Sequence, residues 1–270
     1  MYYKLISLDL DGTTLDPQGK ITEGTLKAIR YAKSKGVHVV VNTGRSFAIS
    51  HDVAARLEAS EDLLCSVGTV CFHNFYDNGG TYMFRHSFDF ELASRLLKCL
   101  ESLPIYRTVF SGREIYTDTF SANMGNAKRN ALFRPEWIVD NLTEYVDKQG
   151  IRLIEKFSAV ADHETLLETE KVVKREFPNV NTMWSSPGMF EMIPEGVDKG
   201  TGLRDLAAYY GIQRHEVIAC GDSNNDWAML QYAGLPVATA NADDETKAIC
   251  RYITKSNAED GVAHMIYELI

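Results

Sequence analysis

The chain has 270 residues and a formal net charge of −9, and 45% of its residues are hydrophobic, as in ordinary globular proteins. Its length exceeds that of a typical single domain, so we expect about two domains. No apolar stretch approaches the roughly 20 residues that span a bilayer, and no signal-peptide pattern is present, so no membrane segment is expected. Five scattered cysteines without a Cys-x-x-Cys pair predict a cytoplasmic protein with reduced thiols. The acidic charge, without a basic arm, argues against a nucleic-acid partner but permits a small anionic substrate.

An apolar run near the start of the chain turns abruptly acidic. Residues 5–8 predict a buried strand, and Asp9 and Asp11 follow it directly, before a turn signal at Gly12. On an extended backbone these two carboxylates point the same way and repel each other unless a cation lies between them. The pattern indicates a hard divalent metal and a reactive carboxylate. Taken alone, it fits a strand that ends in a solvated acidic turn equally well.

The next segment continues as helix and strand. Thr22 predicts the start of a helix that Gly36 ends, and residues 37–41 predict a second buried strand. Such a βαβ unit has parallel strands, and ligands of parallel sheets collect at the carboxyl ends of the strands. Thr43 and Gly44 lie at this end, where a hydroxyl and a bare backbone N–H can hold an oxyanion. As a lone tripeptide, Thr-Gly-Arg is a weak signal.

The pattern changes from about residue 85. Helical stretches alternate there with strand-like segments and hairpin signals, which are largely absent elsewhere. The helical stretches lie near residues 89–102, 134–148 and 163–176, and the strand-like segments cover residues 105–117, 151–159 and 180–193. We therefore predict an α/β domain with an antiparallel sheet at residues 85–190, inserted into a first domain made of residues 1–84 and 191–270.

The strand–helix alternation returns after the insertion. Lys199 falls in the first turn of a predicted helix, where a lysine beside free backbone N–H groups makes a phosphate site. By itself, that segment fits a surface lysine near a helix cap better. A buried strand at residues 216–220 then ends in a second polar cluster, which contains Asp222, Asn225 and Asp226. Neither acidic stretch has the glycine that an EF-hand loop needs at its sixth position, and no P-loop or dinucleotide fingerprint occurs.

Polar clusters at four strand ends or helix starts thus belong to one predicted sheet. In chain order they resemble the four signature motifs of the haloacid dehalogenase (HAD) superfamily: Asp9-Leu-Asp11-Gly-Thr, Thr43, Lys199 and Gly-Asp222-x-x-Asn225-Asp226. The insertion between the second and third motifs is similar to that of the Cof-type phosphatases, which carry a large cap there. The resemblance implies a Rossmann-like parallel-sheet core with an inserted α/β cap domain that contains an antiparallel sheet. The chain departs from the usual pattern of that branch at residues 66–69 and 239–242; the first departure bears on the rim that faces the cap, and so on the substrate.

The resemblance also implies an activity, the hydrolysis of a small phosphorylated metabolite such as a sugar phosphate. Asp9 is the implied nucleophile, which becomes an aspartyl-phosphate, and Asp11 the implied general acid and base. Mg²⁺ is the implied cofactor, with Asp9, the Asp11 backbone carbonyl and Asp222 as ligands and Asp226 as an outer partner. The implied phosphate-binding residues are Leu10, Thr43, Gly44, Lys199 and Asn225. The residue types fit independently, since a carboxylate shielded by a metal is a competent nucleophile and Mg²⁺ prefers oxygen ligands.

Other functions stay open on the same scaffold. A phosphomutase or phosphotransferase shares the aspartyl-phosphate but passes the phosphoryl group to another hydroxyl, and only the product separates it from a phosphatase. A non-catalytic phosphometabolite sensor or interaction protein on the same fold is disfavoured because the chain has all of the reactive residues, namely Asp9, Asp11, Thr43, Lys199 and Asp222. A dehalogenase is disfavoured because its chemistry needs neither Asp11 nor a metal. The sequence does not identify the metabolite or the oligomeric state.

Overall fold

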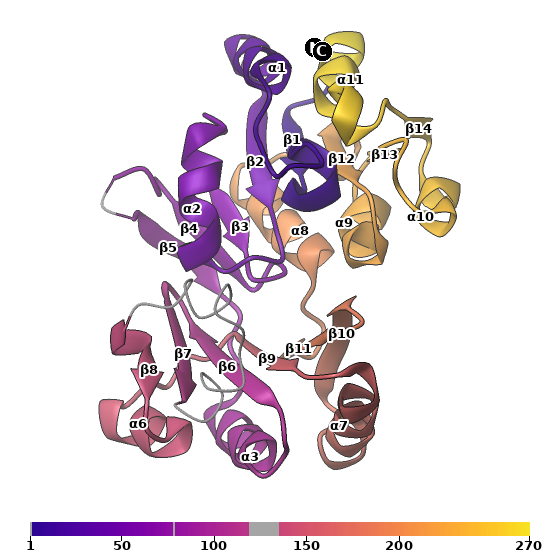
Figure 1. Ribbon diagram of the computed structural model, residues 1–270. Helices are drawn as coiled ribbons and strands as arrows, with labels where there is room; N and C mark the ends of the chain where they lie inside the picture. The colour runs from indigo at the N-terminus through magenta and orange to yellow at the C-terminus, as the bar shows by residue number, and fades with distance from the viewer. Residues whose placement is uncertain (1, 78, 119–134) are drawn as a thin grey trace. The chain divides into compact units, whose positions relative to one another are not determined.

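The computed structural model describes residues 2–77, 79–118 and 135–270. The chain divides into two compact units, whose elements are labelled in Figure 1. The core unit consists of Met1–Arg45, Ser50–Phe84 and Asp198–Ile270, and the inserted unit consists of Ser46–Ile49 and Arg85–Val197. The predicted fold class is confirmed, since one sheet is largely parallel and the other largely antiparallel.

The core unit is built on an eight-stranded sheet in the order β14-β13-β12-β1-β2-β3-β4-β5. Its strands are β1 (Leu5–Leu8), β2 (His38–Asn42), β3 (Leu63–Cys65), β4 (Val70–His73), β5 (Thr81–Arg85), β12 (Val217–Gly221), β13 (Leu235–Ala238) and β14 (Tyr252–Ile253). Neighbours from β14 to β3 run parallel, whereas β3 and β4 form an antiparallel hairpin. Because β1 is buried between β12 and β2, the residue that follows it lies well inside the carboxyl edge of the sheet.

Helices cover this sheet. The helices and short helical turns of this part of the chain are η1 (Leu10–Thr14), α1 (Glu23–Ser34), α2 (Phe47–Arg56), α8 (Lys199–Tyr209), η3 (Arg214–Glu216), η4 (Asn224–Asp226), α9 (Trp227–Tyr232), α10 (Asp244–Ile249), η5 (Asn257–Glu259) and α11 (Gly261–Leu269). Leu203 of α8 and Met229 of α9 join Leu5 of β1 in one apolar cluster. Side chains alternate along a strand, so Ile6 and Leu8 point to the opposite face. Both are fully buried, so both faces of the sheet are covered, as parallel sheets require.

The inserted unit has its own six-stranded sheet, in the order β10-β11-β9-β6-β7-β8. Its elements are α3 (Phe90–Glu101), β6 (Tyr106–Ser111), β7 (Glu114–Asp118), η2 (Pro135–Trp137), β8 (Ile138–Val139), α6 (Leu142–Gln149), β9 (Lys156–Val160), α7 (His163–Glu176), β10 (Val180–Ser186) and β11 (Met189–Pro194). The predicted division at residues 190/191 falls inside β11. Because β11 pairs with β9 and β10, the structure keeps the whole strand in the inserted unit. The use of this unit as a cap stays a prediction.

A backbone contact sets the start of α8. The β3–β4 turn has three successive positive φ angles and ends with 80° at Gly68. A Cβ on Gly68 would lie 2.3 Å from the carbonyl oxygen of Asp198, the N-cap of α8. A Cβ on Gly202 would lie 2.7 Å from the Gly68 carbonyl oxygen. The β3–β4 turn therefore contacts the N-terminal end of α8, the helix that begins at Lys199.

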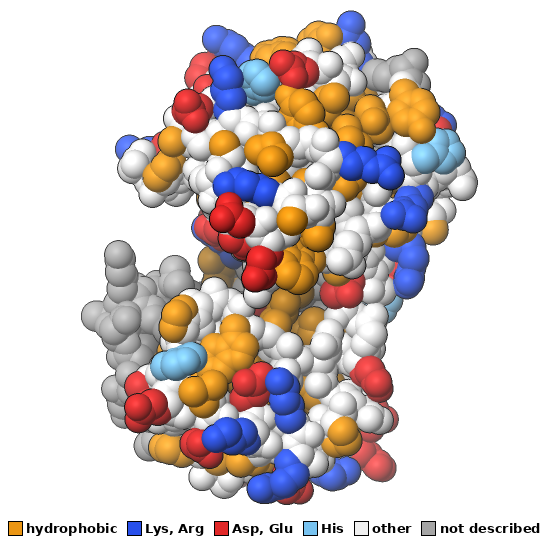
Figure 2. All heavy atoms as spheres, turned by 90° about the vertical axis from the view of Figure 1, so that its right-hand side faces the viewer, with side chains coloured by type: hydrophobic (Ala, Val, Ile, Leu, Met, Phe, Trp, Pro, Cys, Tyr) orange, Lys and Arg blue, Asp and Glu red, His pale blue; other side chains and the backbone are white. Residues whose placement is uncertain are grey.

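One face of the protein is mixed in charge. On the face shown in Figure 2, acidic and basic side chains are interspersed, with apolar side chains among them. This face therefore carries no single-sign field of the kind that draws in a polyanion. In the described part of the chain, every helix is too short or too polar to cross a bilayer.

Gly68→Ala tests the contact that positions α8. Gly36 has a similar φ of 78°, but no atom lies within 4 Å of where its Cβ would be, so Gly36→Ala measures backbone strain alone. We expect Gly36→Ala to lower the free energy of unfolding by about 1–2 kcal/mol. Gly68→Ala should lower it by about 1–3 kcal/mol more, because its Cβ overlaps the backbone of Asp198. Urea unfolding measures both, and equal losses would show that the contact does not constrain α8.

Candidate active site

Side chains from several elements meet at the carboxyl edge of the core sheet. β1 pairs in parallel with β12 on one side and with β2 on the other. Asp9, Asp222 and Thr43 each come directly after one of these three strands. The backbone N–H of Asp9 donates to the Cys220 carbonyl at 3.1 Å, which continues the pairing of β1 and β12 up to Asp9. The sheet therefore brings a carboxylate, a second carboxylate and a hydroxyl to one edge.

The chain turns sharply after Asp9. Within η1, Asp11 has extended angles of φ −79° and ψ 121°, and Gly12 has a left-handed φ of 80°. A Cβ on Gly12 would lie 2.3 Å from Oδ2 of Asp222, so only glycine allows this close approach. The Thr13 hydroxyl donates to Oδ1 of Asp222 at 2.8 Å. The turn thereby holds the Asp222 carboxylate beside the end of β1.

Lys199 is the buried cation of the site. Its side chain is fully buried although it begins α8, and its Nζ donates to Oδ1 of Asp9 at 2.6 Å and to Oδ1 of Asp226 at 2.7 Å. Burial lowers the pKa of Lys199, but the carboxylates of Asp226 and Asp9 outweigh this effect and raise the pKa above its usual value. The lysine therefore stays protonated and ties the end of β1 to η4.

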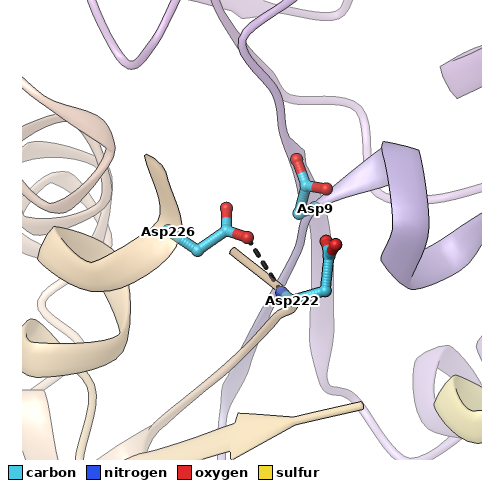
Figure 3. A group of neighbouring side chains, drawn as sticks. All are labelled: Asp9, Asp222 and Asp226. Atoms are coloured by element: carbon cyan, nitrogen blue, oxygen red, sulfur yellow. Dashed lines mark hydrogen bonds between the residues drawn. The ribbon is translucent and has the colours of Figure 1, made fainter. Parts of the chain in front are cut away.

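The carboxylate of Asp226 is already bonded within the protein. One oxygen accepts from Lys199, and the other accepts from the backbone N–H groups of Asp222 at 3.0 Å and Ser223 at 3.3 Å. Figure 3 shows Asp9, Asp222 and Asp226 around one small region, with Asp226 bonded to the Asp222 backbone. Asp226 therefore orients its neighbours.

The remaining oxygens fit a divalent cation. Carboxylate oxygens of Asp9, Asp222 and Asp226 lie within 4.8 Å of one another. In the part of the chain that the structure describes, no donor bonds to Oδ2 of Asp9 or Oδ2 of Asp222. Three carboxylates face one lysine, so negative charge is in excess. Oxygen ligands and excess negative charge suit a hard cation such as Mg²⁺, and the unbonded oxygens of Asp9 and Asp222 are the atoms that could hold it.

The crowding of carboxylates raises their pKa values. Burial raises the pKa of Asp9 from 3.8 to about 8, with help from Asp226 and Asp222 and against the opposing effect of Lys199. Burial and the charge of Asp226 raise the pKa of Asp222 from 3.8 to about 6. Without a cation, both carboxyl groups therefore hold a proton more readily than usual. Such shifted carboxyl groups are typical of functional sites.

Besides Lys199, the residues predicted to hold phosphate lie after a strand end or in short helical turns of the core unit. Leu10 begins η1 directly after Asp9 and is buried. Thr43 follows β2 and is also buried, and its hydroxyl oxygen accepts from a backbone N–H two residues on at 3.2 Å, across Gly44. Asn225 lies in η4, where its Oδ1 accepts from a neighbouring serine hydroxyl at 3.1 Å. Their roles as phosphate ligands stay predictions.

Asp11 is placed differently from the buried cluster. Its side chain is 61% exposed and forms a two-pronged ion pair with Arg45. Nε of Arg45 donates to Oδ2 at 2.8 Å, and Nη2 donates to Oδ1 at 2.5 Å. Nothing in the sequence pairs Arg45 with a residue 34 positions away, so its contact with Asp11 has no sequence signal.

Three further side chains support the site. The Thr13 hydroxyl bonds to Asp222, and the Asn42 side-chain amide donates to the Lys199 carbonyl at 3.0 Å. The Asn241 amide donates to the Gly12 carbonyl at 2.8 Å. Thr13 lies within the first acidic motif and Asn42 next to the Thr-Gly tripeptide, so both could have been inferred. Asn241 comes from a distant loop, within residues 239–242, where the chain departs from the usual pattern of the Cof-type branch but keeps an asparagine.

Lys199→Met tests the charge balance of the cluster. Removing the ammonium group takes the positive charge away from the buried carboxylates of Asp9 and Asp226, so we expect the free energy of unfolding to fall by about 3–5 kcal/mol in the presence of a chelator. Lys148→Met is the matched control, because that lysine pairs with Glu144 on the surface, and it should change stability little. Adding Asp226→Asn to Lys199→Met should recover part of the loss. If both lysine variants lose the same stability, the buried lysine does not balance the cluster.

Comparison with known proteins extends the likeness over the whole chain. Residues 6–266 match the haloacid dehalogenase-like hydrolases. The 5-amino-6-(5-phospho-D-ribitylamino)uracil phosphatase YcsE of Bacillus subtilis (strain 168) is 33% identical over 263 residues, which cover 97% of this chain and 94% of the relative. YitU of the same strain, a phosphatase of the same name, is 30% identical over 275 residues, which cover 98% and 96%. A crystal structure of a haloacid dehalogenase-like hydrolase from Bacteroides thetaiotaomicron has a TM-score of 0.83 at 28% identity and covers 99% of this chain and 100% of its own.

These similarities include the inserted unit as well as the core, so they reach beyond the four motifs. The chain belongs to the haloacid dehalogenase-like hydrolases, in their Cof-type branch, and is a phosphatase of that superfamily.

Proposed function

We propose that the protein hydrolyses a phosphate monoester of a small phosphorylated metabolite, with Mg²⁺ as cofactor and an aspartyl-phosphate on Asp9 as intermediate. The observation that carries the proposal is the bond from buried Lys199 to Asp9 within a cluster of three carboxylates. This bond uses one lone pair of one Asp9 oxygen, so the carboxylate keeps lone pairs both for the cation and for the attack on phosphorus. A carboxylate that is fixed in one orientation and shielded by a cation is a competent nucleophile.

In the first step, Asp9 attacks phosphorus and the ester oxygen departs. Lys199 fixes the plane of the Asp9 carboxylate, and Asp226 in turn holds the lysine and the backbone of Asp222. Mg²⁺ would bind to Asp9, Asp222 and the backbone carbonyl of Asp11, and it would offset the repulsion between the carboxylates and the phosphate. Asp11 gives its proton to the departing oxygen and later takes one from the water that hydrolyses the aspartyl-phosphate.

Donors around the cluster are assigned to the phosphoryl oxygens. They are the backbone N–H groups of Leu10 and Gly44, the Thr43 hydroxyl, the Lys199 ammonium group and the Asn225 amide. Such groups act most strongly when they are oriented before charge shifts onto those oxygens. The anchored positions of Thr43 and Lys199 support this assignment.

The substrate class is a phosphate ester of a polyhydroxylated molecule. Two Bacillus subtilis relatives are named for a 5-phospho-D-ribitylamino compound, which is a phosphorylated sugar-alcohol derivative. At 30–33% identity this supports a phosphorylated small molecule for the present chain rather than that particular compound. A screen of sugar and polyol phosphates that reads released phosphate tests the class.

Replacement of the two aspartates separates their roles. Asp9→Asn removes the nucleophile, so hydrolysis of every substrate should fall by about 10⁴-fold or more. Asp11→Asn removes the acid and base but keeps the backbone carbonyl. Its kcat should fall about 10²–10⁴-fold with a sugar phosphate. With p-nitrophenyl phosphate, whose leaving group departs unprotonated, it should give a burst of nitrophenol followed by slow turnover. Equal losses with both substrates and no burst in rapid mixing would contradict the assignment of Asp11.

The pH dependence of stability tests the metal site without an activity assay. The folded chain holds protons on Asp222 up to about pH 6 and on Asp9 up to about pH 8, whereas unfolded aspartates lose theirs near 3.8. Their contribution to stability is therefore complete below about pH 4 and is lost as the pH rises toward 8. Mg²⁺ binds the deprotonated carboxylates, so its stabilising effect should grow over the same window.

Thermal melts with Mg²⁺ and with a chelator between pH 5 and 8 measure this effect. We expect the difference in Tm to be small at pH 5 and to widen toward pH 8, and Asp222→Asn should remove most of the widening. Hydrolysis of p-nitrophenyl phosphate should need Mg²⁺, and Ca²⁺ should inhibit it because its larger coordination shell is looser. A Tm difference that does not depend on pH, or full activity after exhaustive chelation, would contradict the proposed site.

A further inference from the structure

The ion pair between Arg45 and Asp11 has a geometry suited to orienting a carboxyl group. Two parallel N–H···O bonds, of 2.8 Å from Nε and 2.5 Å from Nη2, join the guanidinium to both oxygens of Asp11. A two-pronged pair of this kind fixes the plane of the carboxyl group as well as its position. It uses one lone pair on each oxygen, and the outer lone pairs remain available for a proton.

Arg45 is itself held in place by its backbone. Its N–H donates to the Thr43 hydroxyl oxygen at 3.2 Å, and its carbonyl accepts from the Ser66 N–H at 2.8 Å. These bonds attach Arg45 to the loop after β2 and to the β3–β4 turn that touches the start of α8. The backbone of Arg45 is therefore held by the same loop and turn that position Thr43 and the start of α8.

Asp11 needs an orienting partner. Its backbone leaves the helical conformation within η1, and its side chain is 61% exposed, whereas that of Arg45 is 28% exposed. A carboxyl group so little enclosed is free to change rotamer unless a bond restrains it. Proton transfer requires the donor within hydrogen-bond reach of the reacting oxygen, and a misplacement of about 1 Å costs roughly 10²-fold.

We infer that Arg45 is the positioning residue of Asp11. The inference rests on the proposed function, in which the Asp11 proton passes to the departing ester oxygen and is replaced from the hydrolytic water. Arg45 holds the carboxyl group in the orientation that both transfers use. It acts through Asp11 and does not bind the substrate.

Arg45→Gln tests the inference, with Arg30→Gln as the matched control. Arg30 forms the same two-pronged pair with Glu58 elsewhere in the core unit, with both N–O distances at 2.7 Å.

The probes are phenyl phosphate, whose leaving group needs a proton, and p-nitrophenyl phosphate, whose leaving group needs it far less. We expect Arg45→Gln to lower kcat for phenyl phosphate by about 10–100-fold with KM little changed. With p-nitrophenyl phosphate, Arg45→Gln should give a burst of nitrophenol followed by slow turnover, as Asp11→Asn does. Arg45→Lys, which restores the charge but not the two-pronged pair, should recover only part of kcat. Arg30→Gln should behave as the unmodified protein.

A double-mutant cycle separates positioning from other roles. In the Asp11→Asn background, Arg45→Gln should cause no further loss, because the group that it positions is gone. A further loss of equal size in that background, or a raised KM for both probes, would overturn the inference by showing that Arg45 binds the phosphate or supports the fold. If Asp11→Asn behaves as expected and Arg45→Gln matches Arg30→Gln, the inference fails and the proposed function stands. If Asp11→Asn does not change the dependence on leaving group, both fail.

Discussion

The buried ammonium group of Lys199 is the interaction on which this site depends. It bonds to Asp9 and Asp226, and a third carboxylate, that of Asp222, lies within reach of the same cluster. Burying such groups is costly unless charges and hydrogen bonds are matched closely. The lysine offsets only part of the negative charge, and the remainder suits the cluster to a divalent cation.

The fold places this lysine through backbone contacts rather than through side-chain packing alone. The β3–β4 turn at Gly68 touches the backbone at Gly202, and the Asn42 amide bonds to the carbonyl of Lys199 itself. On the other side of the cluster, Gly12 lets the turn after β1 approach Asp222. Small residues at these positions allow three strand ends and one helix start to come close enough for their charged groups to meet.

The sequence predicts the parts of this arrangement that follow from periodicity. Apolar runs followed by polar residues mark the carboxyl ends of parallel strands, so the meeting of Asp9 and Asp222 could be expected before the structure was known. Two kinds of feature could not. The pairing of Arg45 with Asp11 joins residues on separate loops, for which no local pattern exists. The bounds of some elements also differ from those expected. A helix expected over residues 134–148 is observed as α6, whose N-cap Asn141 accepts a hydrogen bond from the Glu144 N–H. Residues 119–134 lie outside the described part of the chain.

The central claim is that Asp9 becomes covalently phosphorylated. Quenching the protein with acid during turnover of a ³²P-labelled phosphate monoester, followed by digestion and mass spectrometry, tests this claim most directly, since an acyl phosphate survives brief acid treatment. The account predicts label in the peptide that contains Asp9, located on that residue, and none in an Asp9→Asn variant. Label on another residue, or turnover without any protein-bound label under conditions in which the hydrolytic step is slow, would contradict it.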